Sequence, residues 1–306
     1  MVPPVTVLEV IQRSADFLTK KGVDSPRLQA ELLLAHRLKL PRMKLYLNFE
    51  QKLTDAELSE VRELVQRRGR REPLQQIVGS TSFCGLEIAV NRHVLVPRPE
   101  TELLAERGWE FLKNARGKAG TKETEETEGP TGTRAALDFG TGSGCLAIAL
   151  AIKNLQAHIW ALDQSSEALE IARQNASRHG VTDRIQFLQS KGLSALSPEQ
   201  RFDLIISNPP YIPSGEIAAL QPEVHDYEPK EALDGGADGL DFYRMLGAEA
   251  RPFLQKEGRM MLEFGAGQAD ALRQIFESQN WIVESIVEDY NQHPRIVILK
   301  HGQFPN

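Results

Sequence analysis

Strand-like and helix-like segments alternate along the chain from Ala135 onward, and this pattern restricts the fold more than any other feature. The strand-like apolar runs cover residues 135–139, 158–162, 185–188, 203–207, 260–264, 281–286 and 296–299. Segments with helical spacing begin at Cys145 and Ser166, between the first three runs. Such alternation is typical of a parallel sheet with helices on both faces. The last two runs lie too close together for a crossover helix, so we expect a mostly parallel α/β sheet with an antiparallel edge.

A helical texture precedes this region. Apolar residues recur at helical spacing from Val5 to about Arg71, which predicts a small helical domain over residues 1–72. Ser25-Pro26 offers an N-cap and a proline at the first helical position, and Thr54 with Glu57 forms a capping box, so helices should start near 26 and 55. The cluster that ends the third helix consists of Arg67, Arg68, Arg70 and Arg71. Such cations are typical of a helix C-terminus, although a docking patch for an acidic partner stays open.

Residues 73–96 show a different residue pattern. β-like runs at 76–78 and 86–90, separated by glycines, indicate a β-hairpin linker. The proline-containing segment 96–102 then predicts a helix that runs to about Asn114, with Glu100 or Glu102 in its first turn. Residues 97–306 form the remaining domain. Within it, residues 115–134 contain almost no large apolar side chain and predict a mobile surface loop.

Composition and charge exclude several classes of protein. Hydrophobic residues make up 41% and charged residues 25% of the 306, a balance typical of globular domains that fold in water. The net charge of −6 lacks the cationic field of sequence-independent DNA binding. Cys84 and Cys145 match no metal-ligand spacing, which favours a reducing, cytoplasmic setting without a bound metal. The longest apolar run, 145–152, is far shorter than the roughly 20 residues that span a bilayer, and we recognise no signal peptide.

A glycine-rich turn follows the first strand of the α/β region. Residues 138–144 read Asp-Phe-Gly-Thr-Gly-Ser-Gly, between a strand and a helix, where glycines let the backbone approach a ligand and the helix offers free N–H groups. Asp163 ends the next strand, where an acidic side chain can accept hydrogen bonds from a ribose diol. The predicted ligand-binding residues are Gly140, Thr141, Gly142, Ser143, Gly144 and Asp163. They predict a nucleotide-like ligand, and nicotinamide enzymes use a similar turn.

The tetrapeptide Asn208-Pro209-Pro210-Tyr211 directly follows another buried strand. Because ligands bind at the carboxyl ends of strands in such sheets, this tetrapeptide and the glycine turn should face the same crevice. The prolines lack N–H groups and have a fixed φ, so the segment presents acceptors in a rigid arrangement. It suits a planar NH2 group, which would donate to the Asn208 side-chain oxygen and the Pro209 carbonyl beneath the Tyr211 ring. A simple strand-ending turn is the alternative.

These segments, with 96–102 and 227–240, resemble the class I methyltransferases that use S-adenosylmethionine, and among them the release factor glutamine methyltransferases. The resemblance covers nearly the whole chain. It implies a Rossmann-like class I fold in which Gly140–Gly144 hold the methionine and ribose part of S-adenosylmethionine and Asp163 binds the ribose hydroxyls. It also implies that residues 208–211 hold the target amide and that Asn208 lies beside the cofactor as well.

One departure concerns adenine recognition. The family usually has an acidic residue followed by an aromatic residue near the end of the third strand, and here these positions hold Lys191 and Gly192. We expect backbone groups around Gly192, or the side chain of Leu193, to do part of this task, and cofactor binding to be weaker.

The resemblance implies methylation of the side-chain amide nitrogen, N5, of a glutamine in peptide chain release factors. The enzyme would be a cytoplasmic monomer whose helical domain helps to dock the release factor, with no membrane association and no stable binding of nucleic acid. Asn208, Pro209 and Tyr211 would act by orienting the amide, so no general base is needed and His93 and His225 receive no catalytic role.

Other functions stay open on the residues alone. The same tetrapeptide occurs in enzymes that methylate an exocyclic base amine of RNA or DNA. The acidic balance and the absence of an added basic recognition domain argue against that substrate. A nicotinamide oxidoreductase would share only the glycine turn and leave 208–211 without a purpose, and a non-catalytic binding module is the last alternative.

Overall fold

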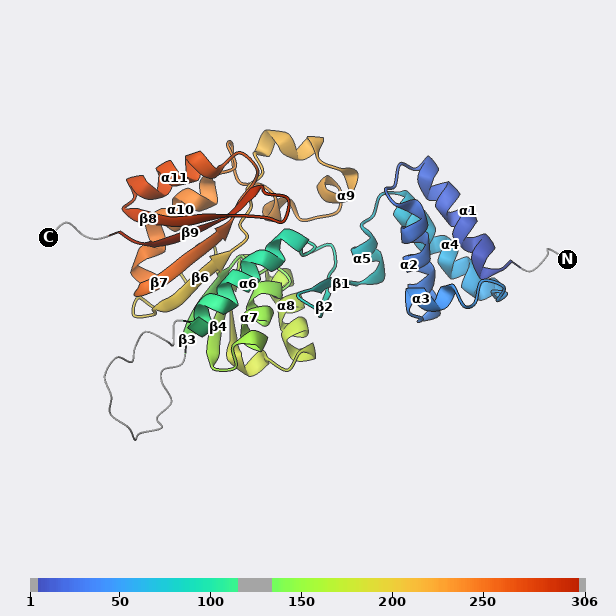
Figure 1. Cartoon of the computed structure of the whole chain (residues 1–306), viewed down its shortest axis with the longest axis horizontal. Coiled ribbons are helices and arrows are strands. Elements are labelled where there is room, and N and C mark those ends of the chain that lie inside the picture. The colour runs from blue at the N-terminus through green and yellow to red at the C-terminus, as the bar shows by residue number, and fades with distance from the viewer. Residues whose placement is uncertain (1–4, 115–133, 303–306) are drawn as a thin grey trace. The chain divides into compact units, whose positions relative to one another are not determined.

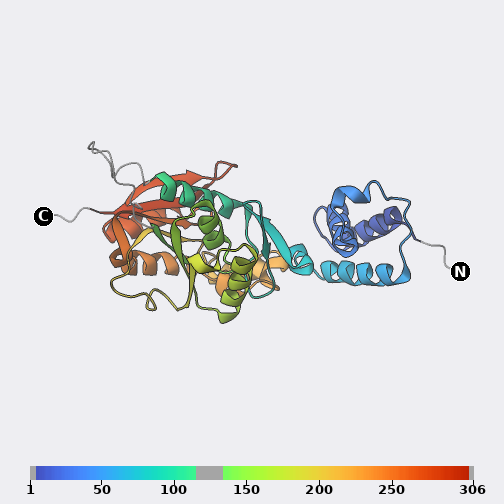
Figure 2. The same cartoon turned by 90° about the horizontal axis from the view of Figure 1, so that it is seen from below.

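The computed structural model describes residues 5–114 and 134–302. Within these ranges the chain forms two compact units (Figures 1 and 2). The first comprises the residues up to Ser80 together with Leu220–Tyr227, and the second comprises Thr81–Ala219 and the residues from Glu228 onward.

The first unit is helical. Its helices are α1 (Val7–Lys20), α2 (Pro26–Leu38), α3 (Arg42–Leu45), α4 (Asp55–Gly69), α5 (Leu74–Val78) and α9 (Pro222–His225). Buried apolar residues such as Ile11, Leu34 and Val61 form its core. In the predicted capping box, the Glu57 N–H donates to Thr54 Oγ1 over 3.3 Å and the Thr54 N–H donates to Glu57 Oε2 over 2.8 Å. The predicted helix starts near 26 and 55 are confirmed.

Two local predictions for this part of the chain are wrong. Ser25 does not cap α2 with its side chain, because its backbone is left-handed, at φ 49°, and an N-cap of that kind needs an extended residue. Residues 76–78 belong to helix α5 and not to a strand, because Pro73 and Gly79 bound a single helical turn whose Ile77 is buried in the helical core. A short apolar run does not separate helix from strand by itself.

Most of the arginine cluster is used inside the first unit. Arg71 Nε donates to Glu223 Oε1 over 2.6 Å and Arg68 Nη2 donates to the same oxygen over 2.7 Å. Arg67 Nε donates to Glu72 over 2.9 Å. These three arginines are therefore paired with glutamates of the same unit. A docking patch would instead need them unpaired, so that they could bind an acidic partner.

In the second unit, two sheets occur within the described residues. The elements are β1 (Ser80–Phe83), β2 (Leu86–Ala89), α6 (Pro99–Asn114), β3 (Arg134–Phe139), α7 (Cys145–Lys153), β4 (Ala157–Asp163), α8 (Ser166–Arg178), β5 (Ile185–Gln189), β6 (Phe202–Ser207), α10 (Asp241–Glu249), β7 (Leu254–Glu263), α11 (Ala269–Ser278), β8 (Trp281–Glu288) and β9 (Pro294–His301). Short 3-10 helices cover Thr182–Arg184, Ser214–Ala219, Lys230–Ala232 and Arg251–Phe253. The hairpin turn between β1 and β2 places Cys84 and Gly85 at φ 51° and 77°, as a two-residue type I′ turn requires.

The large sheet has the strand order β5-β4-β3-β6-β7-β9-β8 among the described residues. The pairs β3–β4, β3–β6, β4–β5 and β6–β7 are parallel, whereas β9 runs antiparallel to both β7 and β8. The predicted mostly parallel sheet with an antiparallel edge is therefore confirmed. The predicted loop at 115–134 lies outside the described residues except for Arg134, which begins β3.

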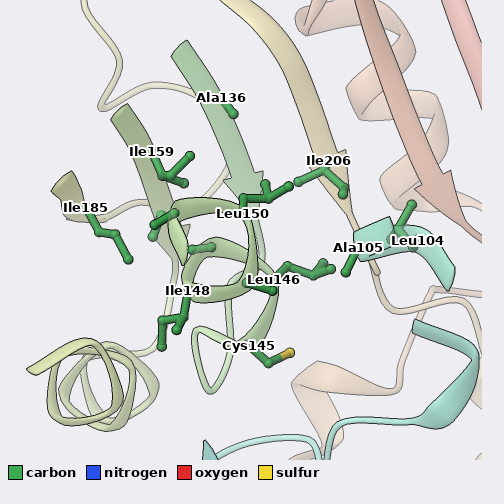
Figure 3. Close-up of a cluster of buried hydrophobic side chains, with 14 of the residues drawn as sticks. Leu104, Ala105, Ala136, Cys145, Leu146, Ile148, Leu150, Ile159, Ile185 and Ile206 are labelled. Atoms are coloured by element: carbon green, nitrogen blue, oxygen red, sulfur yellow. The ribbon is translucent and has the colours of Figure 1, made fainter. Parts of the chain in front are cut away.

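Helices cover both faces of this sheet (Figure 1). On one face, α6, α7 and α8 bury apolar side chains against the sheet, and Figure 3 shows Leu150 of α7 pointing toward Ile206 of β6 and Leu146 toward Ala105 of α6. On the other face, α10 and α11 pack over residues such as Ile205 and Leu262. The alternation of strand side chains between two cores fixes the sheet register, and with it the positions of the strand ends.

Candidate active site

A cleft of about 1140 Å³ opens in the second unit where β3, β4, β5 and β6 end. The sequence-predicted residues that line it are Gly140, Gly142, Asp163, Gly192, Asn208 and Pro210. Thr141, Ser143, Gly144, Pro209 and Tyr211 are not part of its lining. The segments that follow four separate strands therefore meet at one edge of the sheet, as expected for parallel strands.

The glycine turn is held firmly and leaves its backbone open to the cleft. Gly140 and Gly142 have φ 71° and 54°, and a Cβ on either would meet no atom within 4 Å. The N–H groups of Gly140 and Thr141 both donate to the Leu162 carbonyl over 2.8 Å. Gly144 has a different task, because a Cβ there would lie 3.0 Å from Cβ of Ala172 in α8. The first two glycines thus provide open backbone, and the third provides close packing of α7 on α8.

Asp138 lies fully buried at the base of this turn. Its Oδ2 accepts from Thr141 Oγ1 over 2.6 Å and from the Ala147 N–H over 3.1 Å. Its Oδ1 is buried with no hydrogen-bond partner among the described residues. Burial raises the pKa of this carboxyl to about 7. An unpartnered buried acceptor is costly, and a positively charged ligand near the turn would offset that cost electrostatically.

Asp163 is bonded directly to the glycine turn. Its Oδ2 accepts from the Gly142 N–H over 2.8 Å, and its Oδ1 accepts from the Ser165 N–H over 2.9 Å. Burial raises the pKa of Asp163 above its usual value, although these backbone N–H groups oppose the shift. Each carboxylate oxygen keeps a second lone pair, so Asp163 can still accept hydrogen bonds from a ligand in the cleft.

The cleft lining near Gly192 includes residues that the sequence did not suggest. Phe242, Met245 and Glu249 of α10 line the same cleft, and a Cβ on Gly192 would lie 3.7 Å from Glu249 Oε2. Leu193 is 2% exposed and packs into the core, so it does not line the cleft. These α10 residues lie about 50 positions from Gly192 in the chain and form no motif, so only the fold brings them together.

The Asn208 side chain belongs to a buried chain of hydrogen bonds. Its Nδ2 donates to Thr101 Oγ1 over 3.0 Å, and Thr101 Oγ1 donates to Glu263 Oε2 over 2.7 Å. Thr101 lies in the first turn of α6 and Glu263 ends β7, and both are 2–3% exposed. Sequence reasoning assigned neither residue a role. The only signals were the position of Thr101 in the 96–102 segment and that of Glu263 at the end of a strand.

The rest of the tetrapeptide is distributed differently. Pro210 lines the cleft, whereas Pro209 is buried. The ring of Tyr211 packs against Gly265, where a Cβ would lie 3.0 Å from Tyr211 Cδ2. The Tyr211 carbonyl accepts from Gln268 Nε2 over 3.0 Å, and burial raises the pKa of the Tyr211 hydroxyl to about 12. The stacking of this ring on a bound amide stays a prediction.

Neither a metal-binding cluster nor a membrane-spanning helix occurs in residues 5–114 and 134–302. No group of three or more His, Cys, Asp or Glu side chains in these ranges could hold a metal ion. No helix in the same ranges is long and apolar enough to cross a membrane.

Solved structures share the fold over most of the chain. The hMettl16 catalytic domain in complex with MAT2A 3′UTR hairpin 1 matches with a TM-score of 0.53 and 16% identity, over 82% of each chain. A methyltransferase from Pyrococcus furiosus matches with a TM-score of 0.50 and 21% identity, over 78% of this chain and 99% of the other. At such identities the likeness concerns the fold alone.

Sequence comparisons identify the family. Residues 9–79 match the PrmC N-terminal domain and residues 125–221 match the methyltransferase small domain. The release factor glutamine methyltransferase of Geobacter sulfurreducens is 41% identical over 292 residues, and that of Chlorobaculum tepidum is 39% identical over 293 residues. Each alignment covers 95% of both chains. With this identity over almost the full length of its relatives, the chain is a methyltransferase that belongs to the release factor glutamine methyltransferase family.

Proposed function

We propose that the protein transfers the methyl group of S-adenosylmethionine to the N5 side-chain amide nitrogen of a glutamine in a peptide chain release factor. The observation that carries the proposal is the orientation of Asn208. Because its Nδ2 donates to Thr101, its Oδ1 is left as an acceptor, and Asn208 lines the cleft. A carboxamide substrate offers two N–H donors, so an acceptor at this position matches it.

The cleft has features that fit S-adenosylmethionine. The open backbone at Gly140 and Gly142 leaves room for a ligand, and we assign the methionine and ribose part to Gly140–Gly144. Asp163 lines the cleft with lone pairs free for the ribose hydroxyls. When Asp138 is ionised, its unpartnered Oδ1 would place negative charge beneath the turn and favour a cationic ligand.

We assign the adenine base to the lining around Gly192. Phe242 and Met245 offer apolar contact area there, and Glu249 offers a carboxylate that can accept from an amino group. This assignment replaces the acidic and aromatic pair that the family usually has at 191 and 192. Glu249 supplies an acid from a different element of the fold.

The chemistry required is methylation of a poor nucleophile. S-adenosylmethionine supplies an electrophilic methyl group on a sulfonium, so that a new N–C bond forms as the C–S bond breaks. The amide lone pair is delocalised into the carbonyl, so the protein must orient the nitrogen. Asn208 Oδ1 and the Pro209 carbonyl would accept the two amide hydrogens and favour the positive charge that grows on nitrogen. The methylated nitrogen then releases a proton to water.

Substrate docking is assigned to the helical part of the chain. In this proposal residues 1–72 help to bind the release factor and residues 97–306 carry out methyl transfer. Residues 73–96 link these two domains. The protein acts on a protein partner as a monomer in the cytoplasm.

A labelling experiment tests the substrate. The protein is incubated with methyl-labelled S-adenosylmethionine and, separately, with a release factor, its Gln-to-Ala variant, ribosomal RNA and DNA. We expect label on the release factor, none on the variant, and a mass increase of one methyl group on the glutamine peptide. Label on nucleic acid but not on the release factor would overturn the proposal in favour of a base-amine substrate.

A further inference from the structure

Thr101 and Glu263 lie outside the tetrapeptide motif, yet their side chains form a chain of hydrogen bonds with Asn208. Asn208 follows β6, Thr101 lies in the first turn of α6 and Glu263 ends β7, so three separate elements meet at this point. The hydrogen bonds run from Asn208 Nδ2 to Thr101 Oγ1 over 3.0 Å and from Thr101 Oγ1 to Glu263 Oε2 over 2.7 Å.

The direction of these bonds follows from the number of protons. A hydroxyl has one proton, and Thr101 donates it to Glu263, because an ionised carboxylate can only accept. Thr101 Oγ1 can then only accept from Asn208, which must turn its NH2 toward Thr101. The Asn208 Oδ1 is thereby left for another donor. With the opposite direction, Asn208 would present its NH2 to the cleft, where the NH2 of a substrate amide could not bond to it.

Glu263 is an unusual group at such a position. It is 2% exposed, and within the described residues it forms no ion pair within 4.0 Å. The charged and titratable groups around it are Arg98 just before α6, Glu100 in the first turn of α6, Arg295 of β9, Tyr211 after β6 and Tyr243 of α10. Tyr243 donates its hydroxyl to the Glu263 backbone carbonyl over 2.8 Å. A buried carboxylate without a paired cation contributes little to stability, so a different role would explain it.

We propose that Thr101 and Glu263 are positioning residues for methyl transfer: Glu263 accepts the hydrogen bond that the Thr101 hydroxyl donates, and Thr101 Oγ1 accepts from Asn208 Nδ2, which leaves the Asn208 oxygen free for the substrate amide. The inference rests on the proposed function for the identity of that substrate. The orientation of Asn208 itself does not depend on it.

This arrangement makes activity depend on pH. Burial raises the pKa of Glu263 to about 7, while the hydrogen bond from Thr101 opposes the shift. Once protonated, Glu263 can donate a hydrogen bond to Thr101 Oγ1, and the Thr101 hydroxyl can then donate to Asn208. The Asn208 amide would rotate so that its Oδ1 faces Thr101 and its NH2 faces the cleft. Because the ionised form is the competent one, kcat should rise as the pH rises through about 7.

Three variants and a control separate positioning from a purely structural role. Thr101→Val keeps the shape and removes the hydroxyl, Thr101→Ser keeps the hydroxyl, and Glu263→Gln removes the titration. Ser278→Ala is the control, because it also removes a helix hydroxyl, one that is exposed in α11 and bonded to the Ile275 carbonyl. Circular dichroism and S-adenosylmethionine affinity verify that each variant folds.

We expect Thr101→Val to lower kcat roughly 10- to 100-fold, as small misplacements of a reacting group do, while the Kd for S-adenosylmethionine changes less than about twofold. Thr101→Ser should recover most of the loss. Glu263→Gln should remove the rise of kcat around pH 7. An unchanged kcat for Thr101→Val, or a Glu263→Gln pH profile that matches the wild-type profile, would overturn the inference.

A second measurement needs no methyl acceptor. With 15N-asparagine labelling and Asn208→Asp for assignment, NMR reports the Asn208 side-chain NH2 directly. A bonded Nδ2 should exchange its protons slowly in the wild type and in Thr101→Ser, and fast in Thr101→Val. If the wild type fails to methylate release factors but shows this protection, only the proposed function fails. Fast exchange in the wild type would refute the positioning role.

Discussion

The carboxylate of Asp163 accepts a hydrogen bond from the Gly142 N–H, with 2.8 Å between Oδ2 and the nitrogen. This bond joins the end of β4 to the turn that follows β3, so that an acid and an open glycine backbone line one cleft. The two residues are 21 positions apart in the chain. Their contact follows from the parallel pairing of β3 with β4, which places both carboxyl ends at the same edge.

Removal of the Asp163 carboxylate should weaken cofactor binding. We expect Asp163→Ala to raise the Kd for S-adenosylmethionine roughly 10- to 100-fold, because hydrogen bonds to a charged group contribute about 1.5–3 kcal/mol each. Titration calorimetry measures the change. Asp183→Ala, at an exposed acid in a 3-10 turn, is the control and should bind normally. An Asp163→Ala protein with wild-type affinity would show that this acid does not hold the ribose.

Asn208 should affect turnover far more than cofactor affinity. Asn208→Ala removes an acceptor from the reacting amide, and we expect kcat to fall on the order of 100-fold or more, as when one preorganised hydrogen-bonding group is lost. Steady-state kinetics with a release factor measure kcat, and calorimetry measures S-adenosylmethionine binding. Asn114→Ala, at an exposed position at the end of α6, serves as the control. Equal losses in turnover and in cofactor affinity would mean that Asn208 acts on the cofactor.

The α10 residues should determine how tightly adenine is held. Glu249→Gln removes a carboxylate close to Gly192, and we expect it to raise the Kd for S-adenosylmethionine several-fold, about 1 kcal/mol for one hydrogen bond. The variant should also discriminate less against a cofactor analogue that lacks the adenine amino group. Glu257→Gln, at an exposed position in β7, is the control. Unchanged discrimination in Glu249→Gln would place the adenine elsewhere in the cleft.

Patterns that repeat along the chain predicted the fold. Strand-like runs alternating with helices required a parallel sheet, and the short interval between 281–286 and 296–299 required the antiparallel edge that β8 and β9 form. The glycine turn and the Asn208 tetrapeptide were placed at one edge by the same reasoning. The failures are local. Serine is a favoured N-cap residue, but the backbone of Ser25 is left-handed. Residues 76–78 are apolar enough for either a helix or a strand.

Contacts between distant residues were beyond prediction from the sequence. Thr101 and Glu263 lie 162 positions apart, and their bond exists because α6 packs on both β6 and β7. Its approach to β6 is close at Gly108, where a Cβ would lie 2.9 Å from Ile206 Cδ1. Glu249 reaches Gly192 only because α10 covers the opposite face of the sheet. Neither contact has a characteristic spacing or composition in the sequence. The tetrapeptide could therefore be recognised from the sequence, but the groups that orient it could not.

The ion pairs of Glu223 should make the helical unit sensitive to acid. Burial raises the pKa of Glu223, but the hydrogen bonds from Arg71 and Arg68 outweigh it and hold the pKa below its usual value of 4.5. A carboxyl whose pKa is lower in the folded than in the unfolded state stabilises the fold at pH values above its unfolded pKa. It loses that contribution as the pH falls through its folded pKa.

We expect Glu223→Gln to lower the free energy of unfolding of this unit by about 2 kcal/mol at pH 7. This is less than the 3–5 kcal/mol of a fully buried pair, because Arg71 stays partly solvated. The variant should also lose less stability than the wild type below pH 4.5. Hydrogen exchange of residues 5–80 by mass spectrometry reports this unit separately, with Glu63→Gln, at an exposed position of α4, as the control. Equal acid sensitivity in Glu223→Gln and the wild type would contradict the assigned role of this carboxylate.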